Sequence, residues 1–505
     1  MKIKAAFAGA ALLVAAHTRA FAQDGSYHYR FDYWPNRAVR ILNIEYPQTM
    51  VRSSALPFTR QDVSTILESS TADEERGLSA FYRRRLTLLK SGYSQNGNQQ
   101  RVFELSWRNT PAYSDHLHPN EKLRLESDLL GFVQVRDGLA AYFDFQFDTD
   151  GIADSDYHGT YEWKDVVGDM RAAYFQYTSK KWSLLVGRDF VHWGPGSTGA
   201  LLTSGYAPSL DMIKLTLDLW KFRFQGFNAL LNRGSEAEDF EKINRYFSGH
   251  RLSFRSNLIE LGINETILYG GPREVVSPIY LNPLIPYYFA DVMMSEKRKD
   301  NVTLSFEATF YWPQDFRFYG QYLVDEYYYE GEHYPKRTGL LLGADWIRAC
   351  GSSRCWLNLE YVRIDRWVYN YEMTAPWNRL NYYNSLLGHP MGPDGDLIHV
   401  APELYLGHEL ILRTAFDYYR HGETTVSTPL NTEEQLEQHH VKFPFGVVEK
   451  TASFSFEFEY APSVQWLINL TFQHQTRKNV ANVQGVHSNR SAFLVRIQHN
   501  LHKIF

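Results

Sequence analysis

The stretch Ser453-Phe454-Ser455-Phe456-Glu457-Phe458-Glu459-Tyr460 alternates strictly between small or charged side chains and aromatic ones. Successive side chains of a β-strand point to opposite faces, so this stretch has one polar face and one aromatic face. The same alternation recurs in paired runs of about ten residues, the length that crosses a bilayer as a tilted strand. The pattern predicts an all-β transmembrane barrel in an outer membrane.

The composition agrees with a barrel. Of the 505 residues, 15% are aromatic, and the mean hydropathy is negative. Beyond the N-terminus no apolar run approaches the roughly 18 residues that a spanning helix needs. In lipid, only helices and closed barrels satisfy every backbone polar group, so the barrel remains. The formal charge of −5 comes with no basic patch, and we expect no nucleic-acid partner.

The N-terminus has the features of an export signal. Lys2 and Lys4 precede an apolar run over residues 5–16, and small residues lead to a cleavage site after Ala22. The run is too short for a membrane anchor, so residues 1–22 are predicted to be a signal peptide that is removed.

Residues 23–100 are predicted to form a periplasmic region whose helices cap the barrel. Thr59 is a suitable helix N-cap, and apolar side chains follow it at helical spacing over residues 63–67. A second helix is expected over residues 74–89, where basic and apolar residues alternate. These helices either only close the barrel mouth or, through their basic face, provide a docking or polymer-guiding surface.

The barrel itself is predicted over residues 101–505, with about eighteen antiparallel strands, an even number as in bacterial barrels. The expected strands are 102–109, 123–136, 138–149, 170–178, 182–193, 210–218, 220–231, 247–256, 258–269, 301–312, 316–328, 337–349, 354–369, 397–407, 409–422, 451–461, 464–479 and 491–505.

The connections between these runs alternate in length. Tight turns such as Asp137-Gly138 and Pro462-Ser463 separate long segments such as 270–300 and 370–396. This alternation predicts one rim of short turns facing the periplasm and one rim of long loops facing outward, with both termini periplasmic. Phe505 resembles the C-terminal aromatic signal by which barrel-insertion machinery recognises its clients.

The two cysteines, Cys350 and Cys355, lie between two strand-like runs, where a short turn would bring their sulfurs close. In an exported protein this spacing favours a disulfide that pins a hairpin. A metal or redox site is the alternative, but no histidine or third cysteine lies nearby at ligand spacing. We expect no metal and no cofactor.

Several motifs together resemble the Wzi-type capsule-assembly outer-membrane proteins. They are Leu56-Pro57-Phe58-Thr59-Arg60, Gly187-Arg188-Asp189 leading to Trp193-Gly194-Pro195-Gly196, Tyr280-Leu281-Asn282-Pro283-Leu284, Tyr319-Gly320-Gln321-Tyr322-Leu323-Val324-Asp325-Glu326, and Gly388-His389-Pro390-Met391-Gly392-Pro393-Asp394. The resemblance implies a monomeric barrel, plugged by helices and loops, that acts as a non-catalytic surface lectin for capsular polysaccharide.

The long outer segments contain the residue types that bind sugars. Aromatic faces pack on the apolar faces of sugars, and planar polar side chains bind hydroxyls. Aromatic residues of an interfacial girdle have the same composition, so both interpretations stay open. The candidate polysaccharide-binding residues are His192, Trp193, Tyr206, Trp377, Arg379, Tyr382, Tyr383, His389 and Asp394.

Other motif residues are expected to shape the scaffold. Gly194, Pro195 and Gly196 form a bent stretch that either folds a loop into the lumen or turns the chain at the rim. The pairs Asn282-Pro283 and Asp325-Glu326 are expected to brace loops through hydrogen bonds rather than bind ligand. The remaining glycines and prolines of the motifs are also expected to be structural. These residues are Gly187, Arg188, Asn282, Pro283, Asp325, Glu326, Gly388, Gly392 and Pro393.

An enzyme is a weaker hypothesis. Ser204, His192 and Asp211 could be drawn as a triad, but a triad is defined by spatial geometry and no Gly-x-Ser-x-Gly elbow is present. Metal-ligand spacing is also missing from the pair His439-His440 and from the scattered C-terminal histidines His474, His487, His499 and His502.

The main alternative to a lectin is a porin for small solutes or sugars, since eighteen strands enclose a lumen wide enough to conduct. The two hypotheses differ in whether the N-terminal helices and the long loops fill the lumen.

Overall fold

A computed structural model gives the fold. It describes residues 40–41, 43–44, 51–52, 54–56, 102–114, 123–136, 138–149, 162–163, 166–231, 243–272, 274–294, 300–312, 315–326, 337–351, 353–371, 375–407, 409–428, 442–463 and 465–504. The predicted signal peptide and the predicted helices after Thr59 lie outside these residues.

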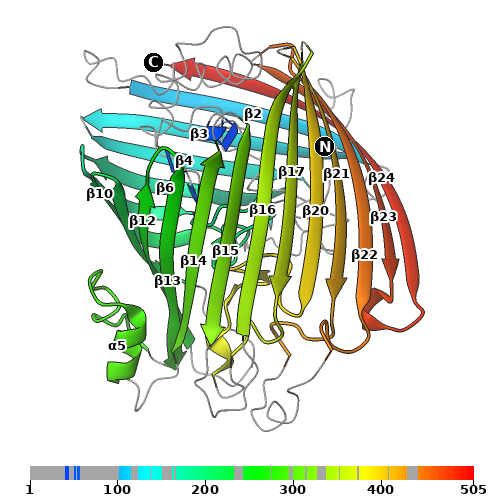
Figure 1. The fold of residues 1–505 in the computed structure, drawn as a ribbon. Helices are drawn as coiled ribbons and strands as arrows, with labels where there is room; N and C mark the ends of the chain where they lie inside the picture. The colour runs from blue at the N-terminus through cyan, green and yellow to red at the C-terminus, as the bar shows by residue number, and fades with distance from the viewer. Residues whose placement is uncertain are drawn as a thin grey trace.

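Eighteen antiparallel strands form a closed barrel in which each strand pairs with the next along the chain (Figure 1). The last strand pairs with the first, for example at Trp107↔Leu501, so no edge is left open. The strands are β2 (Val102–Ser114), β3 (Leu123–Arg136), β4 (Leu139–Asp148), β6 (Val166–Thr178), β7 (Trp182–Asp189), β10 (Leu210–Leu219), β11 (Phe222–Leu230), β12 (Ile243–Arg255), β13 (Ile259–Pro272), β14 (Asn301–Trp312), β15 (Phe316–Glu326), β16 (Arg337–Cys350), β17 (Ser353–Ile364), β20 (Gly395–Leu406), β21 (Leu410–His421), β22 (Glu449–Tyr460), β23 (Trp466–Lys478) and β24 (His487–Ile504). The predicted fold class is confirmed.

The wall has the polarity of a membrane barrel, apolar outside and polar inside. On β14 the buried, inward side chains include Thr303, Ser305 and Glu307, and the alternate positions point outward with Phe306 43% exposed. A soluble protein would bury the aromatic face instead. The observed arrangement leaves the apolar face for lipid.

Aromatic side chains ring the outer surface near the short turns. Trp182, Trp220, Trp312, Phe316 and Trp466 are all exposed there. Aromatic rings are favoured at a membrane–water interface, so these residues mark one boundary of the lipid-facing band. Both ends of the barrel, at Val102 and Ile504, lie at this short-turn rim because the connections alternate in length around the wall.

Two predicted strands end earlier than expected. The predicted strand 182–193 leaves the wall after Asp189, and the predicted strand 354–369 leaves it after Ile364. The residues that follow continue the apolar pattern, but they turn into the lumen and pack there. Alternation alone does not distinguish a wall strand from a buried segment that continues it.

A small three-stranded sheet lies apart from the wall. It consists of β1 (Ala55–Leu56), β8 (His192–Trp193) and β9 (Thr203–Ser204). Leu56 pairs with His192, and His192 pairs in turn with Ser204. Residues from the predicted N-terminal cap therefore join a loop that comes from the wall.

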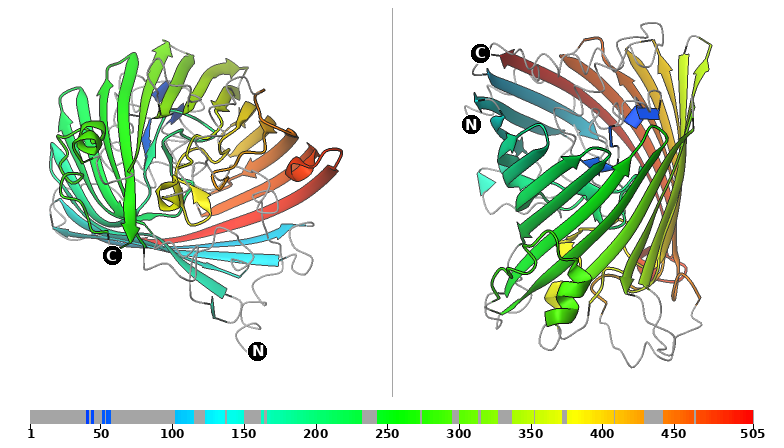
Figure 2. Two further views of the ribbon diagram at one scale, coloured as in Figure 1. Left: turned by 90° about the horizontal axis from the view of Figure 1, so that it is seen from below. Right: turned by 60° about the vertical axis from the view of Figure 1, so that its left-hand side comes forward.

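Two further features involve connections between strands. Cys350 and Cys355 form a disulfide across the β16–β17 turn. The connection from β13 to β14 includes a helix, α5 (Tyr287–Met294), which no sequence pattern predicted and which lies beside β13 at the long-loop rim (Figures 1 and 2). Within the described ranges, helices are all too short or too polar to span a membrane.

The polarity of the wall makes a direct prediction for Phe306. Replacing this outward residue with Arg should lower the free energy of unfolding by about 2–4 kcal/mol, because the charge would face hydrocarbon near the middle of the band. Denaturant titration in phospholipid vesicles, followed by tryptophan fluorescence, measures the change. Phe306→Leu is the control, and equal effects of the two substitutions would contradict the assigned outer face.

Candidate functional site

Two connections from the long-loop rim fold into the barrel. We call residues 190–209 the first lumen segment and residues 365–394, described except for 372–374, the second lumen segment. The first contains β8 and β9; the second contains a 3-10 turn over Pro376–Asn378 and the short strands β18 (Asn381–Tyr382) and β19 (Ser385–Leu386). Viewed along the barrel, the yellow second segment lies within the ring of strands (Figure 2, left).

The first lumen segment is stabilised at its base by His192 and Trp193. The His192 ring is fully buried, and its Nδ1 and Nε2 lie 3.0 and 2.8 Å from the carbonyl oxygens of Ser204 and Gly194. Trp193 is 1% exposed and packs on Phe227 of the inner wall, with ring centroids 5.2 Å apart. Both side chains are structural parts of the segment.

Inward polar side chains of the wall bind the bend of this segment. Gln321 accepts a hydrogen bond from the Leu201 amide at 2.8 Å and donates one to the Trp193 carbonyl at 3.1 Å. Arg317 donates to the Pro195 carbonyl at 2.9 Å. The Gly194-Pro195-Gly196 bend therefore lies in the lumen.

Glu360 of β17 accepts hydrogen bonds from the residues that follow the bend, Ser197 and Thr198. The backbone amides of Ser197 and Thr198 donate to its two carboxylate oxygens at 2.6 and 2.8 Å, and the Tyr319 hydroxyl donates at 2.7 Å. A buried carboxylate is costly unless hydrogen bonds replace its hydration. The backbone of the first lumen segment supplies part of that replacement.

The second lumen segment packs on the first. The Tyr369 hydroxyl donates to the Leu201 carbonyl, and the Tyr369 amide donates to Asp325 of β15 at 2.7 Å. Gly388 is needed at this contact because a Cβ there would lie 2.5 Å from the Tyr369 ring. Two loops from different parts of the barrel thus form one packed unit.

His389 joins the same unit. Its Nδ1 accepts a hydrogen bond from the Met391 amide at 3.2 Å, and its Nε2 lies 3.1 Å from the Thr198 hydroxyl. An accepting Nδ1 requires the neutral ring. Burial, reinforced by His192, lowers the pKa of His389 to about 3.

The upper part of the second segment is attached to the wall by Arg245 of β12. This guanidinium donates to the carbonyl oxygens of Trp377, Arg379 and Asn381 at 2.7–3.0 Å. The Trp377 indole donates to the Gly270 carbonyl at 3.0 Å. These contacts hold the backbone so that the nearby side chains occupy fixed positions.

Asp394 ends the second lumen segment. It accepts hydrogen bonds from the amides of Phe445 and Thr424, at 2.9 and 3.2 Å, and is 1% exposed. Gly392 adopts φ of +78° in the preceding turn, a conformation that glycine allows without strain. With buried Pro393, these residues connect the segment to the loop after β21.

Burial divides the nine sequence candidates into two groups. His192, Trp193, Tyr382, His389 and Asp394 are buried and present almost no surface to a polymer. Tyr206, Trp377 and Arg379 are half-buried, and Tyr383 is 37% exposed, with its ring 4.6 Å from that of Tyr382. Only the second group offers surface to a ligand arriving at the long-loop rim.

The proposed triad is not assembled. His192 contacts carbonyl oxygens and the Ser204 hydroxyl donates to the Gly388 carbonyl, so neither activates the other. Asp211 lies on the outer face of the wall. There it forms a bidentate ion pair with Arg188, the residue after Gly187, with N–O distances of 2.6 and 2.8 Å. Among the described residues, no group of three metal-ligating side chains is present.

The remaining motif residues lie elsewhere. Asn282 and Pro283 are exposed in the external β13–β14 connection, where the Asn282 side chain accepts a hydrogen bond from the Leu284 amide at 3.0 Å. The side chain of Glu326 lies outside the described residues.

Stacked cation–aromatic pairs at the long-loop rim were not identified from the sequence. Arg363 lies 3.9 Å from the ring centroid of Phe443, and Arg366 lies 3.6 Å from that of Phe445. Phe443 and Phe445 lie about 80 residues after the two arginines in the sequence, so no local spacing indicates the pairing. A signal was available in the two closely spaced aromatics Phe443 and Phe445, which follow a mostly polar stretch over residues 431–440.

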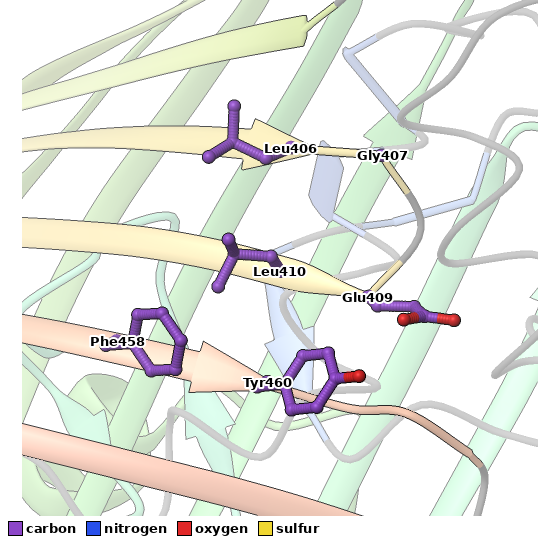
Figure 3. A pocket seen from close by; sticks show the side chains of 6 residues that line it. All are labelled: Leu406, Gly407, Glu409, Leu410, Phe458 and Tyr460. Atoms are coloured by element: carbon purple, nitrogen blue, oxygen red, sulfur yellow. The ribbon is translucent and has the colours of Figure 1, made fainter.

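A shallow groove lies at the opposite, short-turn rim (Figure 3). Leu406, Leu410, Phe458 and Tyr460 line it, with Gly407 and Glu409 at its end. Its walls belong to the outward, lipid-facing strand faces, and they offer few groups to bind hydroxyls. The groove is unsuited to a sugar.

Comparison with known families finds one that spans most of the chain. The family described as capsule assembly protein Wzi matches residues 64–492. No match was found among curated protein sequences.

Among solved structures, the chain is similar to Wzi of Escherichia coli, described as an outer-membrane protein involved in group 1 capsule assembly and a carbohydrate-binding β-barrel. The identity is 14%, the TM-score is 0.61, and the match covers 91% of this chain and 97% of that one. Pseudomonas aeruginosa OprD has 10% identity over 80% of this chain and 95% of its own, with a TM-score of 0.43. Acinetobacter baumannii OccAB4 has 10% identity over 81% and 100%, with a TM-score of 0.43.

The hydrogen bonds of Glu360 predict what holds the first lumen segment. Replacing Glu360 with Ala leaves the Ser197 and Thr198 amides without their acceptor, which should cost about 3 kcal/mol locally and speed their hydrogen exchange about 100-fold. Exchange measured by mass spectrometry on peptides covering 193–202 tests this. Glu360→Gln keeps the shape and should have a smaller effect; unchanged exchange in the Ala variant would contradict the assigned contact.

The buried His389 predicts a pH dependence of stability. Its pKa is about 3 in the fold and about 6.5 when unfolded, so between these values only the unfolded state binds the proton. Stability should therefore fall as the pH decreases from about 6.5 to 3. His389→Gln should remove the contribution of one proton from the slope of the free energy of unfolding against pH. Denaturation midpoints at several pH values measure this slope. Equal slopes in the variant and the parent protein would show that His389 protonates in the fold.

Proposed function

This chain belongs to the capsule assembly protein Wzi family, and on that premise we propose that it binds capsular or other extracellular polysaccharide at the cell surface. The protein acts as a lectin that organises the polymer and catalyses no reaction. It is an outer-membrane barrel, and the short-turn rim with both ends of the barrel faces the periplasm. The long-loop rim faces outward, toward the polymer.

The observation that carries this proposal is the packing of the long-loop connections into the lumen. Wall side chains Arg245, Gln321, Asp325 and Glu360 all bind backbone groups of the two lumen segments. A diffusion channel needs a continuous water-filled path, whereas these segments fill part of the lumen with packed protein. Fixed loops instead suit a surface that holds a ligand at the rim.

The proposed contact surface consists of Trp377, Arg379 and Tyr383 of the second lumen segment, together with Tyr206 of the first. Tyr383 has an exposed ring for the apolar face of a sugar, and Arg379 supplies donors for hydroxyl or carboxylate groups. Each repeat of the polymer would bind weakly, and many repeats together would give retention. A monomer is sufficient for this mode of binding.

The double variant Tyr383→Ala and Arg379→Ala tests the contact surface. It should reduce binding of purified extracellular polysaccharide from the producing bacterium about tenfold or more, because stacking and hydrogen bonds are lost together. Surface plasmon resonance with immobilised protein measures the binding. Val486→Ala, in an exposed position of another rim loop, is the matched control.

Conductance in planar bilayers separates this proposal from a porin. A silent protein that retains polysaccharide supports the lectin; a steadily conducting protein whose polysaccharide binding is unaffected by the double variant would support a channel instead.

A further inference from the structure

Two strands carry polar groups on the face that should meet lipid. His250 of β12 and Glu265 of β13 point outward, on the same faces as exposed Leu252 and Ile263. The two polar residues are register partners, and Glu265 is also paired with Leu304 of β14, which is apolar. On β13 and β14 the polar pair therefore interrupts a run of apolar outward side chains.

The height of this pair places it within the membrane. Strand β13 begins at Ile259, close to the aromatic residues of the short-turn rim. At about 3.3 Å per residue and a tilt of about 40°, Glu265 lies about 15 Å above that point, inside an apolar band about 25 Å tall. A carboxylate facing acyl chains at this height would be destabilising.

Residues 274–294, which we call the external segment, cover the pair. The Tyr287 amide donates to Glu265 at 2.9 Å, and the Tyr287 hydroxyl lies 3.0 Å from Nε2 of His250. The Nδ1 of His250 lies 3.2 Å from Glu265, and the rings of Tyr287 and His250 stack at 4.2 Å. The inner side of the segment thus hydrogen-bonds the polar groups of the wall.

The same segment also covers apolar wall residues. Ile267 and Tyr269, the next outward positions of β13, are 0% and 1% exposed because Tyr280, Tyr287 and Ala290 pack on them. The cover is therefore a packed layer on the outside of the barrel, where α5 lies beside β13 (Figure 1).

The outer side of this layer is apolar and exposed. Leu284 is 87% exposed, Met293 74%, Phe289 61% and Tyr288 56%. So large an apolar cluster on an exposed layer marks an interaction surface. On β13 the outward residue next to covered Glu265 is Ile263, which is 52% exposed, so the apolar lipid-facing wall begins where the cover ends.

We propose that the external segment is a lateral membrane element whose outer side contacts the acyl chains of the leaflet on the long-loop side. In the proposed orientation this is the outer leaflet. The segment replaces lipid over His250 and Glu265 and restores an apolar surface beyond them. Three observations favour lipid as the occupant of this surface. Glu265 lies at the height of the apolar band, the segment covers a polar pair there, and the neighbouring wall residue Ile263 faces lipid.

Site-directed spin labelling tests this proposal in the full chain. Both native cysteines form the disulfide, so a nitroxide can be placed at Met293→Cys and Phe289→Cys. Ile263→Cys is the lipid-facing control, and exposed Ser427→Cys is the water-facing control. The labelled proteins are reconstituted in phosphatidylcholine vesicles, and collision with oxygen is compared with collision with a water-soluble nickel chelate.

We expect labels at Met293 and Phe289 to collide preferentially with oxygen, as at Ile263, because oxygen concentrates in the acyl-chain region. Preferential collision with the nickel chelate, as at Ser427, would overturn the proposal. It would show that the surface faces water in the purified protein, as expected of a site for a protein partner that is absent from the vesicles.

A second measurement uses no label. Met293→Asp should shift the denaturation midpoint in vesicles to lower denaturant, whereas Ser427→Asp should not. Equal midpoints for Met293→Asp and the parent protein would also overturn the proposal.

Discussion

The structure depends on the inversion of polarity that a lipid environment imposes on a closed sheet. Lipid requires apolar side chains outside, so strict alternation places polar and charged side chains inside, as with Thr303, Ser305 and Glu307 on β14. Those inward groups must find hydrogen-bond partners. Where water does not supply them, protein must, and the backbone of the two lumen segments does so at Glu360, Gln321 and Asp325.

This requirement explains why the strands of the barrel could be predicted from the sequence, whereas the packing of the segments inside the lumen could not. Each wall strand is specified by its own alternation, so the eighteen strands follow from local patterns. The contact between Ser197 and Glu360 joins residues 163 positions apart, and its parts are ordinary polar residues. His192, Trp193 and His389 have the composition of a sugar site, yet they are buried because they connect the lumen segments to each other and to the wall.

The external segment shows the same principle on the other face. The helix α5 is short and was not predicted, and tertiary contacts rather than its own sequence stabilise it. A signal was nonetheless present, because His250 and Glu265 interrupt the outward apolar pattern of two predicted strands. A polar pair between apolar outward side chains of neighbouring strands points to a place where another part of the chain covers the wall.

Strand β12 connects the two faces. Its inward Arg245 binds the backbone of residues 377–381, and its outward Tyr246 and His250 contact the external segment. Protein therefore packs on both sides of this strand. The proposed contact residues Arg379 and Tyr383 extend from a backbone fixed to that strand. A ligand that binds prepositioned side chains loses less of its binding energy to ordering them, which favours weak, repeated contacts along a polymer.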